Sequence, residues 1–257
     1  HTFEKGTINE NYVLKRINLS LEPGDFVTII GGNGAGKSTL LNSIAGTFSV
    51  DQGQILLNGK NITKKSVVER SKSISRVFQD PKLGTAVRLT VEENLALAMK
   101  RGKKRGFFRG VKPQDRKFFK EQLARLNLGL ENRLSSEIGL LSGGQRQAIT
   151  LLMATLQRPE LILLDEHTAA LDPATSKTVM DLTEKLITEQ NLTAFMVTHD
   201  MEDAIRYGNR LIMLHQGRIV VDIQQEEKQQ LTVPQLLALF KQNSGTTLKD
   251  DQVLLSS

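Results

Sequence analysis

One nine-residue run constrains this chain more than any other, GGNGAGKST at positions 31–39. Its glycines permit positive φ and close approach, so several backbone N–H groups can converge on one anion. The lysine adds a positive charge and the next hydroxyl offers a ligand for Mg²⁺, a combination suited to a nucleoside triphosphate. The residues predicted to contact it are Gly31, Gly32, Asn33, Gly34, Ala35, Gly36, Lys37, Ser38 and Thr39.

The residues around this run predict the structural context that a phosphate-binding loop needs. Residues 26–30 are apolar or β-branched and predict a buried parallel strand. Residues 38–45 predict a helix, whose N-terminus favours a phosphate group. A glycine-rich surface turn is the alternative, and the order of strand, loop and helix argues against it.

Length and composition are typical of a globular chain with one main core. The chain has 257 residues, near the upper limit for a single core, so we expect one domain with a subdomain. It has no cysteine, which excludes disulfides and Cys metal sites and suits a reducing cytoplasm. No run approaches the ~18 apolar residues of a membrane span, and no signal peptide is recognised.

Positive charge is concentrated in one segment. The net charge is +6, and ten lysines and arginines lie between Lys100 and Lys120 with Asp115 as the single acid. A solvated basic loop is one interpretation, and contact with anionic lipid headgroups or an acidic partner is another. RNA binding is less favoured, and no nucleic-acid partner is expected. We predict that Phe118 and Phe119 face a helical core.

Two further strands are predicted to end in polar groups. Residues 161–164 are apolar and lead into Asp165 and Glu166, at the edge where open α/β sheets bind ligands. Asp165 would hold Mg²⁺, directly or through water, and Glu166 would polarise an attacking water. The strand predicted at 193–197 leads to His199, which is either structural or able to reach a γ-phosphate.

A second motif, LSGGQRQ at 141–147, narrows the family. With it, residues 3–223 resemble the ATP-hydrolysing subunits of ATP-binding cassette (ABC) transporters, in which this run is the signature sequence. The resemblance implies that the motif binds the γ-phosphate of ATP held by a second subunit. A serine that caps a helix aims backbone N–H groups at an anion, which suits this role. The residues concerned are Ser142, Gly143, Gly144 and Gln145.

The resemblance also implies a hydrolytic centre with ATP and Mg²⁺ as cofactors. Gln79 matches the family's Q-loop glutamine, Glu166 its catalytic base and His199 its switch histidine. The implied metal ligands are Ser38, Gln79 and Asp165. For Gln79, only the resemblance assigns the role.

Two more positions follow from the same resemblance. Asp172, in Ala-Leu-Asp, matches the residue that crosses the dimer interface of the family. Phe3 best matches the aromatic residue that stacks on adenine, with Tyr12 as the alternative. Stacking on either ring would discriminate weakly among purines.

The chain departs from the family at two places. His167 stands where the family usually has proline after Glu166. It either adds a second imidazole near the γ-phosphate or replaces a loop residue, and we favour the second interpretation. The segment 107–120 is longer and more basic than the family's usual linker, so we expect a partner-specific contact there.

The expected fold is an α/β P-loop NTPase of RecA-like type, with a mainly parallel sheet, an N-terminal antiparallel β portion and an inserted helical subdomain. We expect residues 1–80 and 160–223 to form the nucleotide-binding core, residues 81–159 the helical subdomain, and residues 224–257 a tail with an amphipathic stretch at 233–240. Helices are predicted to begin at Thr90, where Glu93 has capping-box spacing, at Pro113 and after Ser142.

The implied protein is a homodimer that sandwiches two ATP molecules at the cytoplasmic face of the cell membrane. Its expected partners are integral membrane permease subunits and an extracellular solute-binding protein. The residues at 165–173 resemble a subgroup linked to uptake of small solutes such as amino acids. An export ATPase, or a soluble ABC ATPase acting on ribosomes or DNA, is the alternative. The transported solute is not encoded in this chain.

Overall fold

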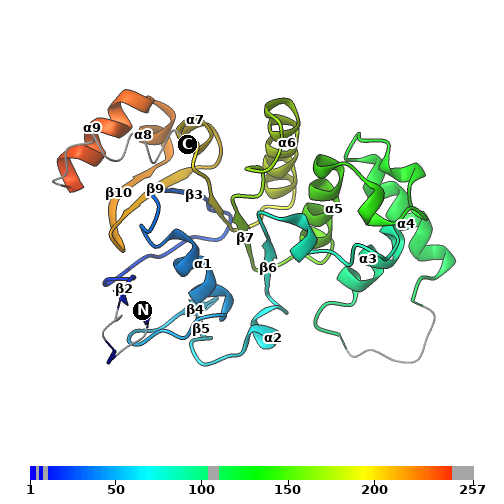
Figure 1. The fold of residues 1–257 in the computed structure, drawn as a ribbon, viewed down its shortest axis with the longest axis horizontal. Coiled ribbons are helices and arrows are strands. Elements are labelled where there is room, and N and C mark those ends of the chain that lie inside the picture. The colour runs from blue at the N-terminus through cyan, green and yellow to red at the C-terminus, as the bar shows by residue number, and fades with distance from the viewer. Residues whose placement is uncertain (4–5, 8–10, 104–109, 245–257) are drawn as a thin grey trace. The chain divides into compact units, whose positions relative to one another are not determined.

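The fold described here comes from a computed structural model. The residues that it describes are 1–3, 6–7, 11–103 and 110–244. They divide into two compact units, one formed by the described residues of 1–70 and 193–244 and the other by the described residues of 71–192 (Figure 1). The functional division predicted from sequence, into a core and a helical subdomain, stays a prediction.

The first unit is built on four strands in the order β10-β9-β3-β8. They are β3 (Phe26–Ile30), β8 (Ala194–Val197), β9 (Arg210–His215) and β10 (Arg218–Gln224). β3 is parallel to both β8 and β9, and β10 is antiparallel to β9. β3 is buried along its whole length, as expected for an apolar strand with a neighbour on each side. The predictions of strands at 26–30 and 193–197 are confirmed.

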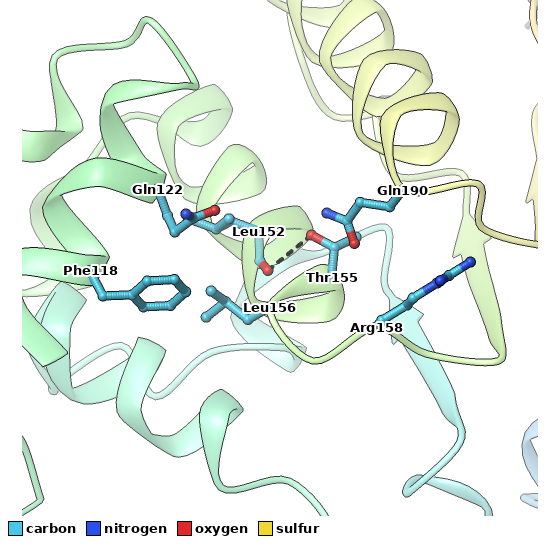
Figure 2. A pocket seen from close by; sticks show the side chains of 7 residues that line it. All are labelled: Phe118, Gln122, Leu152, Thr155, Leu156, Arg158 and Gln190. Atoms are coloured by element: carbon cyan, nitrogen blue, oxygen red, sulfur yellow. Dashed lines mark hydrogen bonds between the residues drawn. The ribbon is translucent and has the colours of Figure 1, made fainter.

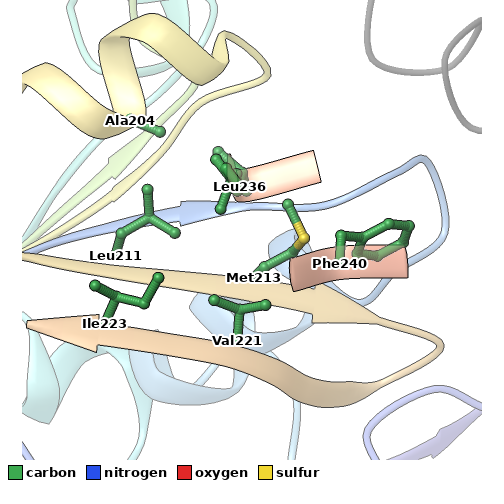
Figure 3. Packing of buried hydrophobic residues seen from close by; sticks show 8 residues of the cluster. Ala204, Leu211, Met213, Val221, Ile223, Leu236 and Phe240 are labelled. Atoms are coloured by element: carbon green, nitrogen blue, oxygen red, sulfur yellow. The ribbon is translucent and has the colours of Figure 1, made fainter. Parts of the chain in front are cut away.

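Five helices belong to this unit within the described residues. They are α1 (Lys37–Ala45), α2 (Val67–Arg70), α7 (Met201–Arg206), α8 (Gln225–Gln229) and α9 (Val233–Ser244). Leu236 and Phe240 of α9 pack into one cluster with Met213 and Val221 of the sheet (Figure 3). The amphipathic stretch predicted in the tail is therefore a helix whose apolar side covers β9 and β10.

Two short hairpins complete the first unit. β1 (Thr2–Phe3) pairs antiparallel with β2 (Asn11–Tyr12), and β4 (Leu56–Leu57) pairs antiparallel with β5 (Lys60–Asn61). They confirm the antiparallel β portion that was predicted near the N-terminus.

The second unit combines two parallel strands with helices. The strands are β6 (Ile74–Val77) and β7 (Leu161–Asp165). The α-helices are α3 (Val91–Met99), α4 (Pro113–Ala124), α5 (Gly143–Thr155) and α6 (Pro173–Glu189). Three 3₁₀ turns are η1 (Pro81–Leu83), η2 (Leu130–Asn132) and η3 (Ile138–Leu140). Thr90 caps α3 in a capping box with Glu93, and α4 begins at Pro113, as predicted.

The basic segment is partly structural. Arg101 donates to Ser75 Oγ and, at 2.6 Å, to the Gln157 carbonyl, and burial lowers the pKa of its guanidinium. Arg116 makes two hydrogen bonds of 2.7 Å to the carboxylate of Glu92. Arg101 therefore stabilises the second unit, whereas Arg116, with a side chain 60% exposed, forms an ion pair at the surface.

The two adjacent phenylalanines of α4 have different environments. Phe119 is fully buried, whereas Phe118 is 38% exposed. The prediction that both face the core is wrong for Phe118, because neighbouring helical residues point about 100° apart. Phe107 and Phe108 lie outside the described residues. Within the described part of the chain, every helix is too short or too polar to cross a membrane.

Candidate functional site

The glycine-rich run forms a tight loop between β3 and α1. Gly31, Gly34 and Gly36 have φ values of 152°, 76° and 103°, which confirms that the run uses glycine's conformational freedom. A Cβ atom at Gly31 would lie 2.2 Å from the Leu214 carbonyl oxygen, so no larger residue fits there without a backbone shift. The loop is therefore fixed by β9 as well as by its own glycines.

Lys37 is the first residue of α1 and lies against this loop. Its Nζ donates to the Gly31 carbonyl at 2.6 Å and to the Gly32 carbonyl at 3.4 Å, and the residue is only 8% exposed. Ser38, in the same helical turn, is exposed. The arrangement brings an ammonium group, a hydroxyl and the positive end of a helix to one place, which suits a phosphate group.

His199 lies at the same edge of the sheet as the loop. It is exposed and follows β8, whose residue Val197 is in register with Ile29 of β3. Asp200 next to it caps α7 by accepting a hydrogen bond of 2.9 Å from the Asp203 amide. The predicted position of His199, at the carboxyl end of a parallel strand, is confirmed, and its role stays a prediction.

The two candidates for adenine stacking lie on the first hairpin. Phe3 pairs with Asn11, and Tyr12 pairs with Thr2. Tyr12 is 48% exposed, and the side chain of Phe3 lies outside the described part of the structure. The choice between these two aromatic residues stays a prediction.

In the second unit, the two predicted carboxylates, Asp165 and Glu166, lie at the carboxyl end of β7. Its four apolar residues are buried and its last residue is Asp165. The Asp165 carboxylate accepts a hydrogen bond of 2.6 Å from Arg76 Nη2, and both side chains are about 15% exposed. The Arg76 guanidinium also lies 4.7 Å from the centre of the Phe78 ring. Sequence reasoning missed Arg76, although a charged residue inside the short apolar strand β6 was a usable signal.

Gln79 follows β6 after one intervening residue and is exposed. Because β6 and β7 are parallel and Val77 is in register with Leu164, both Gln79 and Asp165 lie at the carboxyl ends of paired strands. The Phe78 carbonyl accepts a hydrogen bond of 3.2 Å from Gln147 of α5. The start of the Gln79 loop is thereby attached to the last residue of the signature motif, within α5.

The signature motif forms the N-terminus of α5. Ser142 caps the helix, and Gln145 completes a capping box with hydrogen bonds of 3.2 and 3.3 Å between the two residues. A Cβ at Gly144 would lie 2.1 Å from Thr175 Cγ2, and one at Gly143 would lie 3.2 Å from Leu171 Cδ2. Close packing against Thr175 of α6 accounts for Gly144, whereas Gly143 is exposed and lies near Leu171 of the loop before α6.

The segment 166–172 connects β7 to α6. Glu166 has a φ of 45°, which is rare for a residue with a side chain. His167 is 2% exposed and its Nε2 lies 2.9 Å from Thr183 Oγ1. Burial lowers the pKa of His167 to about 4, so the imidazole is neutral at physiological pH. This enclosed ring favours the structural interpretation of His167. Asp172 caps α6 by accepting from the Thr175 amide at 3.1 Å.

A separate groove of about 200 Å³ lies on the second unit (Figure 2). It is at the end of α5 opposite to Ser142 and contains no acidic side chain, so its chemistry differs from that of the carboxylate and signature region. The residues that line it are Phe118, Gln122, Leu152, Thr155, Leu156, Arg158 and Gln190.

Comparison with known proteins gives one family. A family model described as ABC transporter matches residues 14–169. A tyrosine transport ATP-binding protein of Clostridioides difficile (strain R20291) is 45% identical over 231 residues, which cover 90% of this chain and 92% of the relative. The phosphonates import ATP-binding protein PhnC of Alcaligenes faecalis is 37% identical over 229 residues, with coverages of 86% and 81%. The thiamine import ATP-binding protein ThiQ of a Ruegeria species is 36% identical over 201 residues, with coverages of 78% and 81%.

Solved structures agree with these sequence relatives. The dimeric ATP-binding cassette MJ0796 in a post-hydrolysis state, bound to ADP and Pi, has a TM-score of 0.73 and 32% identity, covering 87% of this chain and 94% of that one. The ATP-binding cassette MJ1267 has a TM-score of 0.75 and 25% identity, with coverages of 91% and 94%. Both similarities extend over nearly the whole chain.

Proposed function

Because the chain belongs to the ABC transporter family, we propose that it is the ATPase subunit of an importer for a small amino acid-like solute such as tyrosine. The observation that carries this proposal is the 45% identity to a tyrosine transport ATP-binding protein over 90% of the chain. The phosphonate and thiamine relatives are 37% and 36% identical over smaller shares of the chain. The expected fold, a P-loop NTPase with a mainly parallel sheet, is confirmed by the solved ATP-binding cassettes.

In this proposal the triphosphate binds at the loop 31–39. The backbone N–H groups and the N-terminus of α1 attract the negative charge. Lys37, held against the loop by the Gly31 and Gly32 carbonyls, supplies a charge to the β- and γ-phosphates. Phe3 or Tyr12 stacks on the adenine ring.

The side chains present fit Mg²⁺. Ser38, Gln79 and Asp165 offer a hydroxyl, an amide and a carboxylate oxygen, and Mg²⁺ in such enzymes takes few protein ligands beside the phosphates. Arg76 donates to Oδ2 of Asp165, and this interaction orients the carboxylate. Among the described residues no cluster of three or more His, Asp or Glu side chains forms a ready-made metal site. When Mg²⁺ is bound, Ser38, Gln79 and Asp165 would hold it, and its charge would neutralise that of the phosphates.

We propose that hydrolysis uses the residues that match the family's catalytic positions. Glu166 polarises the attacking water, Gln79 contacts that water, and His199 contacts the γ-phosphate. A second copy of the chain contributes Ser142–Gln145, and Asp172 crosses the interface. Donors that reach the γ-phosphate in trans stabilise the charge of the transition state. Similar donors in other phosphoryl-transfer enzymes are worth ~10³-fold or more. Loss of the γ-phosphate then favours the open dimer.

The test uses the variant Glu166→Gln. We expect dimers that form with ATP and persist, while the turnover of ATP falls by about 100-fold or more, because binding is kept and the base is lost. The dimer is measured by size-exclusion chromatography with light scattering. A variant that stays monomeric with ATP, yet hydrolyses it at the wild-type rate, would contradict the shared site.

The partners are tested separately. We propose that the chain docks on membrane permease subunits at the cytoplasmic face, with a solute-binding protein outside the cell. Co-purification of a permease with the chain, followed by vesicle uptake of labelled tyrosine, phosphonate and thiamine, identifies the solute class. Stable association with ribosomes or DNA in place of a permease would favour the alternative class of soluble ABC ATPases.

A further inference from the structure

We propose that His167 is a positioning residue, which holds Glu166 in its working conformation through a hydrogen bond to Thr183 of α6. The inference rests on the proposed function, in which Glu166 polarises the attacking water. It concerns a residue that the family resemblance leaves without a role, since the family usually has proline at this position.

The hydrogen bond has a defined direction. Thr183 Oγ1 donates its single proton to the Val179 carbonyl at 2.7 Å. The same oxygen lies 2.9 Å from His167 Nε2, so it accepts there and Nε2 carries the proton. The imidazole is therefore a neutral donor with one tautomer.

The residue before His167 needs support. Glu166 has a φ of 45°, and residues with side chains hold such a conformation only where the surroundings impose it. The Glu166 carbonyl accepts from the Ala169 amide at 3.1 Å, and the Thr168 carbonyl accepts from the Leu171 amide at 3.0 Å. These turns shape the segment, but neither attaches its beginning to the rest of the unit.

His167 supplies that attachment. Thr183 lies in the middle of α6, and Asp172, at the other end of the segment, caps the first turn of the same helix. The segment 166–172 is thus fixed to α6 at both ends. Gly144 of the signature motif packs against Thr175 in the first turn of that helix. One rigid helix therefore holds the predicted base, Asp172 and the beginning of the signature helix.

The first test removes the acceptor and keeps the shape, with Thr183→Val. We expect kcat for ATP to fall about tenfold or more, since small displacements of a catalytic group are costly. We expect the dissociation constant of ATP to stay within twofold, since no phosphate contact is altered. Thr183→Ser keeps the hydroxyl and should retain kcat within about twofold.

Thr178→Val is the matched control. Thr178 is an exposed residue of α6 whose hydroxyl donates to the Ala174 carbonyl at 3.0 Å, in the same manner as Thr183 but without a contact to His167. It should leave kcat unchanged. If Thr178→Val lowers kcat as much as Thr183→Val does, the loss is a general effect on α6 and the inference is wrong.

The second test replaces both partners, with His167→Leu and Thr183→Val combined. An apolar pair leaves no buried polar group without a partner, so the double variant should fold even if a single variant does not. We expect the same loss of kcat as for Thr183→Val alone, because one interaction is removed in each case. A folded double variant with wild-type kcat would overturn the inference.

Glu166→Gln in the same assay separates this inference from the proposed function. If Glu166→Gln retains turnover, then Glu166 is not the base and the proposed function fails at that residue. If Glu166→Gln is inactive and Thr183→Val has wild-type kcat, only the role of His167 fails.

Discussion

The loop 31–39 and the segment 166–172 both follow buried parallel strands, yet they are held in different ways. The loop depends on glycine backbone geometry and on the approach of Gly31 to β9. The segment depends on side chains, with His167 bound to the middle of α6 and Asp172 bound to its first turn. A loop shaped by glycine backbone geometry is destabilised when a side-chain atom is added to a glycine. A segment held by side-chain hydrogen bonds is destabilised when a single polar group is removed.

The largest expected effect concerns the loop. Gly31→Ala would place Cβ 2.2 Å from the Leu214 carbonyl oxygen, and we expect the free energy of unfolding to fall by about 3 kcal/mol or more. ATP binding should weaken at least tenfold. Gly34→Ala is the comparison, because a Cβ there meets nothing within 4 Å and only the strain of φ 76° remains, about 1–2 kcal/mol. Urea unfolding and calorimetry measure both, and equal losses would show that packing against β9 is unimportant.

The next largest effect is the pH dependence of the free energy of unfolding that His167, in the segment 166–172, should cause. Burial lowers the pKa of His167 to about 4 from the ordinary histidine value of 6.5. Between pH 4 and 6.5, His167 is therefore protonated in the unfolded chain and neutral in the folded chain. The contribution of the neutral, buried His167 to the free energy of unfolding is fully present above pH 6.5. It falls by about 3 kcal/mol as the pH is lowered from 6.5 to 4. His167→Gln should reduce the slope of unfolding free energy against pH in that range. An unchanged slope would mean that another group causes the acid sensitivity.

A smaller effect is expected at the Arg76–Asp165 pair, where the side chains are 16% and 15% exposed. Arg76→Met leaves a largely buried carboxylate without its cation. We expect a loss of about 2 kcal/mol, between the values for exposed and fully buried pairs. Arg125→Met is the control, since Arg125 pairs with Glu189 at 2.7 Å with side chains 48% and 39% exposed. It should cost less than about 0.5 kcal/mol. Similar losses in the two variants would contradict the role of burial.

The smallest effect is expected from Asp172→Ala. It removes the N-cap of α6, whose carboxylate accepts from the Thr175 amide at 3.1 Å. The variant should unfold at a slightly lower temperature and urea concentration than the wild type. Asp172→Asn retains a capping oxygen and should restore most of the stability. If both variants are as stable as the wild type, His167 alone fixes the segment to α6.

The features that were predicted well from the sequence are those whose signal lies within a short stretch of consecutive residues. β3, β7 and β8 were recognisable as apolar runs, and the beginnings of α3 and α5 as local capping signals. The phosphate loop was recognisable for the same reason, because the spacing of its glycines is contained in nine residues.

The features that sequence could not supply involve residues far apart in the chain. Arg76 and Asp165 are 89 positions apart, and His167 and Thr183 are 16 apart. Neither pair has a local pattern, so only the three-dimensional structure joins them. The error at Phe118 is of a different kind, since two adjacent aromatic residues of a helix do not share one face.

The approach of Gly144 to Thr175 has an evolutionary consequence. A methyl group added at position 144 would meet Cγ2 of Thr175 at 2.1 Å. A lineage can therefore enlarge residue 144 only after position 175 has become smaller, for example through Thr175→Gly or Thr175→Ala. The two positions should change in that order, and homologous chains with a larger residue at 144 should carry a small residue at 175.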